Sequence, residues 1–176
     1  MGNANKIKLS GIIKESIVDG TGIRYVIFCQ GCIHNCRNCF NPETHSFEGG
    51  KEWDIDAIIE DIAKNPLLQG ITFSGGDPWE QADKCSIIAE SVKKMGLDVW
   101  SYTGYKFEYI LQNLESRNGW AEFIKHVDIL VDGKFEEENK SLLLTFRGSS
   151  NQRIVNVQQS LSSGELVICD FDKKNN

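Results

Sequence analysis

Four of the six cysteines in this chain of 176 residues lie within the stretch FCQGCIHNCRNC, residues 28–39. In a reducing compartment, cysteines clustered in this way bind metals or do redox work more often than they form structural disulfides. Pairing the first two and the last two would make a four-thiolate zinc knot, but zinc ribbons use a longer link between the pairs. The other grouping takes Cys32, Cys36 and Cys39 as a set. Three thiolates can hold three irons of a [4Fe–4S] cube and leave the fourth iron open to another ligand.

Three further loops carry glycine and polar residues at the ends of predicted strands. They are SGGDP (74–78), SYTGY (101–105) and VDGKF (131–135). The cysteines follow another apolar, β-branched run, RYVIFC (24–29), which is typical of a buried strand. Because the carboxyl ends of parallel strands meet on one face, we expect the four loops to converge there.

Strands and helices alternate along the chain, which predicts an α/β fold with βαβ units and parallel strands. The predicted strands cover 24–29, 70–76, 98–105 and 126–135, and the predicted helices cover 53–66, 82–96 and 106–116. Asp54 is expected to cap the first helix and Pro66 to stop it. A further strand is expected at the start of LLLTFRG, followed by a C-terminal edge hairpin that turns at Ser162-Ser163-Gly164.

The length favours one domain over residues 1–176, with a core at about 15–157, because a closed eight-fold barrel takes about 250 residues. An open, incomplete (βα) barrel or a doubly wound sheet would fit. The net charge of −6 argues against a nucleic-acid partner. No apolar run approaches the roughly 18 residues of a membrane span, and the start lacks a signal-peptide pattern, so we expect no membrane partner and a cytoplasmic location.

The stretch CIHNCRNC (32–39) matches the CxxxCxxC signature of radical S-adenosylmethionine enzymes. Together with DGTGIR (19–24), TFSGGDP (72–78) and VDGKF (131–135), the chain resembles the glycyl-radical activating enzymes of that superfamily over most of residues 15–157. The resemblance implies an incomplete barrel of the radical S-adenosylmethionine type. It also implies a [4Fe–4S] cluster on the three cysteines, which act as metal ligands and as the catalytic centre that cleaves the cofactor.

The resemblance further implies that S-adenosylmethionine chelates the open iron, with its amino group near Ser74, Gly75, Gly76 and Asp77. Glycines allow close backbone approach there, and carbonyl or carboxylate oxygens accept from an ammonium group. Thr103 and Asp132 are further candidates for cofactor contacts, although solvated loops would explain them too. Many relatives carry an aromatic residue just before the third cysteine, on the adenine. Here that position is Asn38, with Phe40 on the other side of Cys39, so both are candidate adenine contacts.

Cys29, Cys85 and Cys169 are expected to be small buried apolar residues, and none of the three histidines is expected to bind metal.

The activity that the resemblance implies begins with one electron passing from the cluster to the sulfonium. Methionine leaves, and a 5′-deoxyadenosyl radical takes a hydrogen from a glycine Cα in a partner protein. The favoured partner is the anaerobic ribonucleoside-triphosphate reductase, with a flavodoxin- or ferredoxin-type electron donor. The alternatives are an activator of another glycyl-radical enzyme such as pyruvate formate-lyase and a radical enzyme acting on a small molecule. More remote are a non-catalytic iron–sulfur electron carrier and a zinc module.

Overall fold

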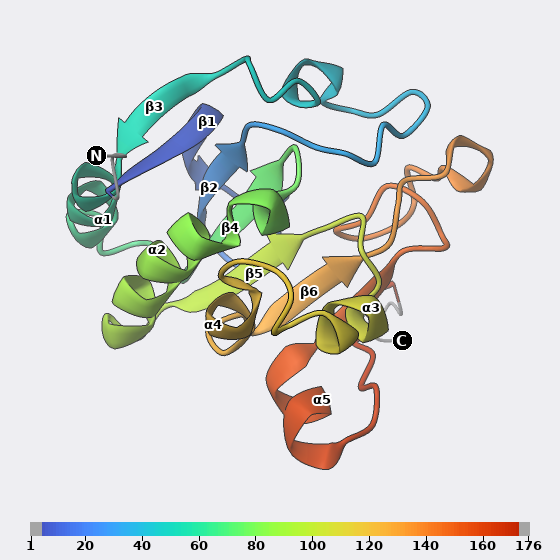
Figure 1. Ribbon diagram of the computed structural model, residues 1–176. Coiled ribbons are helices and arrows are strands. Elements are labelled where there is room, and N and C mark those ends of the chain that lie inside the picture. Colours follow the sequence, from blue (N-terminus) through green and yellow to red (C-terminus); the bar gives the residue numbers. More distant parts are fainter. Residues whose placement is uncertain (1–4, 173–176) are drawn as a thin grey trace.

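The computed structural model describes residues 5–172 and contains a seven-stranded sheet in the order β3-β1-β2-β4-β5-β6-β7 (Figure 1). The strands are β1 (Lys6–Ser16), β2 (Arg24–Cys29), β3 (Lys51–Asp54), β4 (Gly70–Gly75), β5 (Asp98–Tyr102), β6 (Ile129–Asp132) and β7 (Arg153–Asn156). The central strands β2, β4, β5 and β6 run parallel, and antiparallel strands flank them on both edges. The predicted α/β class is therefore confirmed, as an open mixed sheet.

The five α-helices within residues 5–172 contribute to one apolar core on the same face of the sheet. They are α1 (Ile55–Ala63), α2 (Ala82–Lys94), α3 (Phe107–Gln112), α4 (Trp120–Ile124) and α5 (Val157–Ser163). Side chains alternate along a strand, so Ile71 and Phe73 of β4 face these helices while Thr72 and Ser74 face the other side. Helices on one face only distinguish the described structure from a doubly wound sheet, which carries them on both faces.

Loops cover the second face of the sheet. A small apolar cluster of Trp100, Val131 and Ile154 lies there, with Phe146 and Phe171 packed against it. Arg24 is fully buried on this face: its Nε donates to Thr72 Oγ1 at 2.7 Å, and its guanidinium lies 5.3 Å from the centre of the Trp100 ring. Thr72 Oγ1 in turn donates to the Asp19 carbonyl at 2.7 Å, so residues 19–24 are held against the sheet.

The predicted C-terminal hairpin is confirmed in part: β7 is its first strand, but the tight turn expected at Ser162-Ser163-Gly164 is wrong. Residues 157–163 form α5, because Asn156 caps it by accepting from the Gln159 N–H and Gly164 ends it at a φ of 74°. The chain then returns to β7 through a single bridge between Val155 and Ile168. The strand expected at the start of LLLTFRG is also wrong: Leu142 and Leu143 lie in a loop, 88% and 91% exposed.

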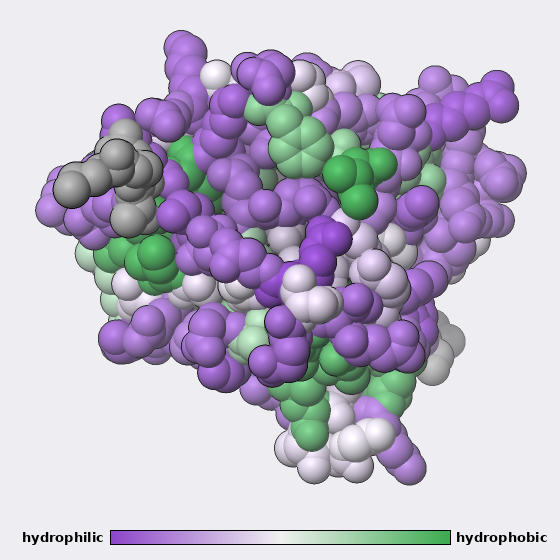
Figure 2. All heavy atoms as spheres, in the orientation of Figure 1, coloured by the Kyte–Doolittle hydropathy of each residue, from purple (hydrophilic) through white to green (hydrophobic). Residues whose placement is uncertain are grey.

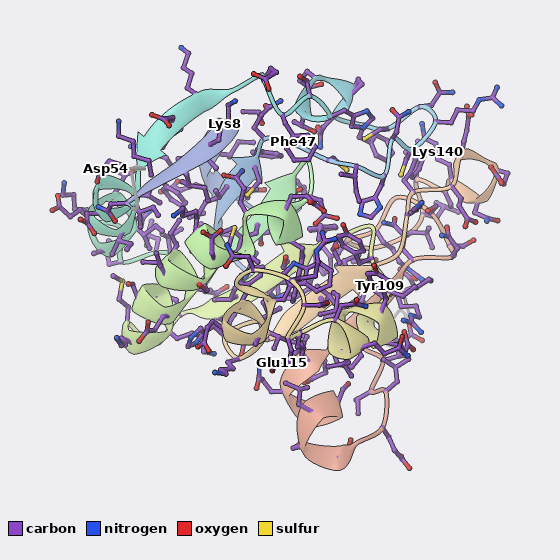
Figure 3. All side chains as sticks on the ribbon, in the orientation of Figure 1. Lys8, Phe47, Asp54, Tyr109, Glu115 and Lys140 are labelled. Atoms are coloured by element: carbon purple, nitrogen blue, oxygen red, sulfur yellow. The ribbon has the colours of Figure 1, made fainter. Side chains whose placement is uncertain are left out.

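Among the other predicted elements, strand 24–29 is confirmed with the same bounds as β2 and the rest are confirmed with shorter bounds. The Asp54 side chain caps α1 by accepting from the Ala57 N–H at 3.0 Å. Strands β1 and β3 and helix α4 were missed. Strand β1 has an irregular burial pattern, so period-2 alternation does not reveal it. It nevertheless supports the loops above it, because Lys8 Nζ donates to the Phe47 carbonyl at 2.5 Å; Figure 3 labels both residues.

Three short 3₁₀ turns complete the described elements: η1 (Pro42–Thr44), η2 (Pro78–Gln81) and η3 (Glu137–Asn139).

The face drawn in Figure 2 is largely hydrophilic, and its hydrophobic residues form small separate patches. Within residues 5–172, no helix is long and apolar enough to span a bilayer.

Candidate cluster and ligand site

A cavity of about 650 Å³ lies where the four unusual loops meet, at the carboxyl ends of β2, β4, β5 and β6. Its lining includes the three cysteines of the loop after β2 and residues 74–76, 103–104 and 133–135. Figure 1 shows β5 and β6 pointing toward the side on which the cysteine loop lies. The expected convergence of the loops is confirmed, and it follows from the parallel order of these strands.

Cys32, Cys36 and Cys39 are half-buried and line this one cavity. Burial raises the pKa of Cys32 to about 11, while the backbone N–H groups of His34 and Asn35 act in the opposite direction. Burial also raises the pKa of Cys36, opposed by the N–H of Phe135. Cys39 Sγ accepts from the Asn41 N–H at 3.4 Å. Backbone donors thus surround sulfurs that would carry negative charge as metal-bound thiolates.

The remaining cysteines lie elsewhere, as expected for Cys29 and Cys85. Both are fully buried in the helix-covered core, with their sulfurs 3.8 Å apart, and burial raises the pKa of Cys85 well above its usual value. Cys169 is half-buried against the small cluster on the second face. Cys29 does not share the cavity with the other three, and this placement disfavours the four-thiolate zinc knot.

No three His, Cys, Asp or Glu side chains are arranged around a single-ion site in the part of the chain that the structure describes. An iron–sulfur cube does not need such an arrangement, because each thiolate binds a different iron of the cube.

Two asparagines shape the cysteine loop by adopting left-handed backbone conformations. Asn35 has a φ of 50° and Asn38 a φ of 51°, a region that asparagine tolerates better than most residues. The Asn38 amide donates to Glu137 and does not line the cavity. Phe40 does line it, with its ring 4.9 Å from the Phe135 ring. Of the two candidate adenine contacts, Phe40 therefore lines the cavity and Asn38 does not.

The glycine loop, which begins with the last residues of β4 (Ser74 and Gly75) and continues through Gly76, packs directly on the cysteine loop. Ser74, Gly75 and Gly76 line the cavity, and Gly75 has a φ of 94°. A Cβ on Gly76 would lie 2.4 Å from the Gly31 carbonyl oxygen, so only glycine allows this approach. The Gly76 N–H donates to the Cys29 carbonyl at 2.7 Å. The two loops are thus joined backbone to backbone.

Asp77 and Asp132 lie behind the cavity wall, fully buried. Asp132 accepts from the Phe107 N–H at 2.8 Å and from Arg153 Nε at 2.9 Å, which anchors α3 and β7 to β6. Asp77 accepts from donors of several loops, including Thr103 Oγ1 at 2.9 Å. Thr103 lines the cavity, but its hydroxyl is engaged in this bond.

Five of the eight predicted cofactor contacts therefore line the cavity: Phe40, Ser74, Gly75, Gly76 and Thr103. Asn38, Asp77 and Asp132 do not. Contact between any of these residues and a cofactor stays a prediction.

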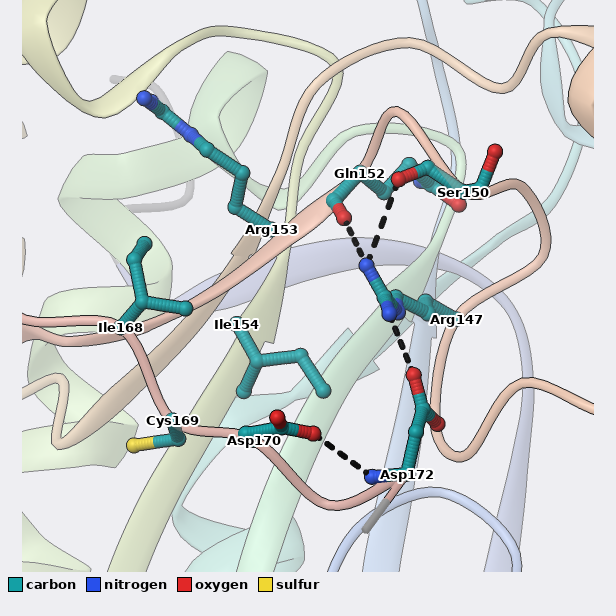
Figure 4. Close-up of a pocket in the computed structure, with 9 residues that line it drawn as sticks. All are labelled: Arg147, Ser150, Gln152, Arg153, Ile154, Ile168, Cys169, Asp170 and Asp172. Carbon is teal, nitrogen blue, oxygen red and sulfur yellow. Dashed lines mark hydrogen bonds and ion pairs between the residues drawn. The ribbon is translucent and has the colours of Figure 1, made fainter.

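A smaller hollow of about 420 Å³ lies beside β7 and the C-terminal segment (Figure 4). Arg147 borders both hollows; it donates to the Gln152 carbonyl at 2.7 Å and pairs with Asp172. Arg153 pairs with Glu108 at 2.7 Å and also with Asp132. Both arginines thus have carboxylate partners within the chain.

Sequence reasoning missed His34 as a site residue and missed the wall formed by Val18, Leu142 and Phe146. His34 lies between two of the cysteines, and its contacts come from loops far away in the sequence. The one available signal for the wall was the apolar run LLL (142–144) within a polar stretch.

Comparison with known proteins identifies the family of this chain. Residues 18–155 match the family described as "4Fe-4S single cluster domain". Similar proteins named "Anaerobic ribonucleoside-triphosphate reductase-activating protein" occur in Enterobacteria phage T4 and in Pasteurella multocida. The phage protein is 35% identical over 144 residues, which cover 78% of this chain and 86% of the phage protein. The Pasteurella protein is 34% identical over 152 residues, covering 81% and 93%.

A protein of the same name from Salmonella typhimurium is 36% identical over 146 residues, covering 77% of this chain and 90% of that protein. The chain has the features of a single-cluster iron–sulfur protein: a cysteine loop at the carboxyl edge of an open α/β sheet. More narrowly, it belongs to the family of anaerobic ribonucleoside-triphosphate reductase-activating proteins.

Proposed function

We propose that this protein installs a glycyl radical on an anaerobic ribonucleoside-triphosphate reductase, using a [4Fe–4S] cluster and S-adenosylmethionine. The observation that carries the proposal is the convergence of Cys32, Cys36 and Cys39 with a glycine-rich loop on one cavity. When bound, the two groups supply one electron and a sulfonium, which react to give methionine and a 5′-deoxyadenosyl radical able to take a hydrogen atom from a glycine Cα.

The donor set of the cavity fits both groups. Three half-buried thiols with backbone N–H donors suit a cluster that leaves one iron open. Ser74 and the backbone of Gly75 and Gly76 supply oxygens for an ammonium group, and Phe40 supplies an aromatic face for adenine. The protein's part is to orient these groups and to keep water and stray hydrogen donors away.

The one-sided sheet suits a large substrate. We propose that the sheet and its helices form one domain with the incomplete barrel of the radical S-adenosylmethionine type. Loops fill only part of the second face of the sheet. The cavity lining includes Val18, Phe40 and Leu142, which are 71%, 57% and 88% exposed. Exposed apolar patches of this kind mark interaction sites, and here the patch would contact the partner's glycine-bearing segment. A flavodoxin- or ferredoxin-type protein would supply the electron.

Electron paramagnetic resonance tests the proposal. The chain is reconstituted with iron and sulfide without oxygen, reduced, and mixed with S-adenosylmethionine and the anaerobic reductase. Parallel samples contain pyruvate formate-lyase or no partner. We expect a glycyl doublet with the reductase and none in the other samples. A doublet with pyruvate formate-lyase alone would replace the proposed partner, and a cluster that does not respond to S-adenosylmethionine would refute the proposed chemistry.

A further inference from the structure

His34 projects from the middle of the cysteine loop into the protein. Its side chain is 5% exposed, and its Nε2 lies 2.7 Å from Oδ2 of Asp77, whose side chain is 1% exposed. The His34 and Tyr105 rings form a T-shaped pair, with ring centres 4.5 Å apart and an angle of 75° between the planes. A Cβ on Gly104 would lie 2.3 Å from His34 Cδ2, so the glycine after Thr103 makes room for the ring.

The Asp77 carboxylate accepts hydrogen bonds on both of its oxygens from groups within the protein. Oδ1 accepts from the Trp79 N–H at 3.0 Å. Oδ2 accepts from Thr103 Oγ1 at 2.9 Å and from the Gly104 N–H at 3.0 Å, in addition to His34. Three of these four contacts fall on Oδ2 and one on Oδ1, so the oxygen that faces His34 is fully engaged within the protein. Asp77 is also fully buried and does not line the cavity, so it binds protein donors rather than a ligand's ammonium group, and in this arrangement His34 would donate to it from Nε2.

This pair joins two functional parts of the site. His34 lies between Cys32 and Cys36, whereas Asp77 follows the glycine loop and binds the loop after β5. Residues 31 and 32 already have backbone bonds to Thr44 and His45. Between Cys32 and Cys36, within residues 5–172, the connection to the loops after β4 and β5 runs through the His34 side chain.

We propose that His34 and Asp77 form a positioning clamp, which sets the cluster-bearing loop at a fixed place relative to the glycine loop that holds the ligand. The inference rests on the proposed function and assigns Asp77 to positioning rather than to ligand contact. Outer partners of metal ligands act in this way, by orienting groups that they do not replace.

The clamp predicts different outcomes for two substitutions of His34. His34→Ala removes the donor and leaves Asp77 short of one partner. His34→Gln keeps an N–H donor at a similar reach. After reconstitution, we expect both variants to hold the wild-type amount of iron and sulfide. Affinity for S-adenosylmethionine, measured by equilibrium dialysis, should fall about tenfold or more in His34→Ala and recover most of that loss in His34→Gln. His126→Ala, at a histidine that does not line the cavity, is the matched control.

A second measurement needs no cluster. Nitrogen-15 spectra of the histidine rings in the metal-free protein report which nitrogen carries the proton. We expect a neutral or doubly protonated His34 ring with Nε2–H protected from exchange, and loss of that protection in Asp77→Asn. A ring protonated only on Nδ1, or one whose Nε2–H exchanges freely, would overturn the clamp.

The outcomes separate the clamp from the proposed function. If S-adenosylmethionine changes the resonance spectrum of the reduced wild-type cluster and of His34→Ala equally, the clamp is overturned while the proposed function stands. If the wild-type cluster ignores S-adenosylmethionine, the proposed function is overturned, and the clamp with it. Selective loss of the response in His34→Ala, with recovery in His34→Gln, supports both.

Discussion

At the scale of single residues, chemically identical cysteines lie in two contrasting environments. Cys29 and Cys32 are three positions apart, yet one is fully buried under the helices and the other lines the cavity. The difference arises because β2 ends at Cys29, whose side chain still follows the alternation of the strand. Cys32 lies beyond Gly31, which has a φ of 101° and turns the chain toward the cavity.

Substitution of these two cysteines should have opposite effects. Cys29→Ala removes one buried sulfur and should lower the free energy of unfolding by about 1 kcal/mol while leaving iron content unchanged. Cys32→Ala should lose the cluster with little change in the stability of the metal-free protein. Urea unfolding and iron and sulfide analysis measure both quantities. If Cys29→Ala loses iron as Cys32→Ala does, the three-cysteine assignment fails.

At the scale of elements, α1 shows how local signals and packing combine. Ile55, Ile58 and Ile62 recur at helical spacing and are buried under the sheet. Asp54, at the end of β3, accepts from the Ala57 N–H and satisfies one of the free donors of the first turn. One residue therefore ends an edge strand and caps the helix that follows it.

Loss of this cap should be measurable without disturbing the cavity. We expect Asp54→Ala to reduce the free energy of unfolding by about 1 kcal/mol in urea, because an N-cap is removed. Asp54→Asn, which keeps a side-chain acceptor, should recover most of that loss and serves as the control. A stability change in Asp54→Asn as large as that in Asp54→Ala would mean that charge, rather than capping, makes the contribution.

At the scale of the whole molecule, the C-terminal segment ties the second face of the sheet together. The Cys169 N–H donates to the Ile154 carbonyl at 2.7 Å, and the Phe171 ring packs 5.4 Å from that of Phe146. Asp172 accepts from the Thr145 N–H at 2.7 Å and pairs with Arg147. The segment thus braces the loop that forms one wall of the cavity.

The stabilisation that Asp172 provides in this segment should depend on pH. The Thr145 N–H and then the Arg147 guanidinium hold the pKa of Asp172 below its usual value of 3.8. Because the folded-state pKa is the lower one, ionised Asp172 stabilises the protein above that usual value, and the contribution is lost as the pH falls through the folded-state pKa. The effect should be small, since the carboxylate is partly exposed.

Asp172→Asn should therefore lower stability at pH 7 and flatten its decline below about pH 4 relative to the wild type, as measured by urea unfolding across pH. Glu165→Gln, at an exposed residue of the same segment, should leave the profile unchanged. Parallel profiles for wild type and Asp172→Asn would show that the ion pair contributes nothing.

The sequence alone determined the features that depend on local spacing. Periodic isoleucines with the Asp54 cap predicted α1, and short apolar runs ending in glycine or cysteine predicted the central parallel strands and the meeting of their loops. The spacing along the chain likewise predicted that Cys32, Cys36 and Cys39 belong together, and all three line one cavity.

Only the tertiary structure decided which polar groups face the cavity. Asp77 and Asp132 looked like ligand contacts in the sequence, but donors from other loops occupy their carboxylates behind the wall. His34 looked unremarkable because its partner is 43 residues away. Hydrogen-bond partners of buried side chains come from segments brought together by folding, so spacing along the chain does not encode them.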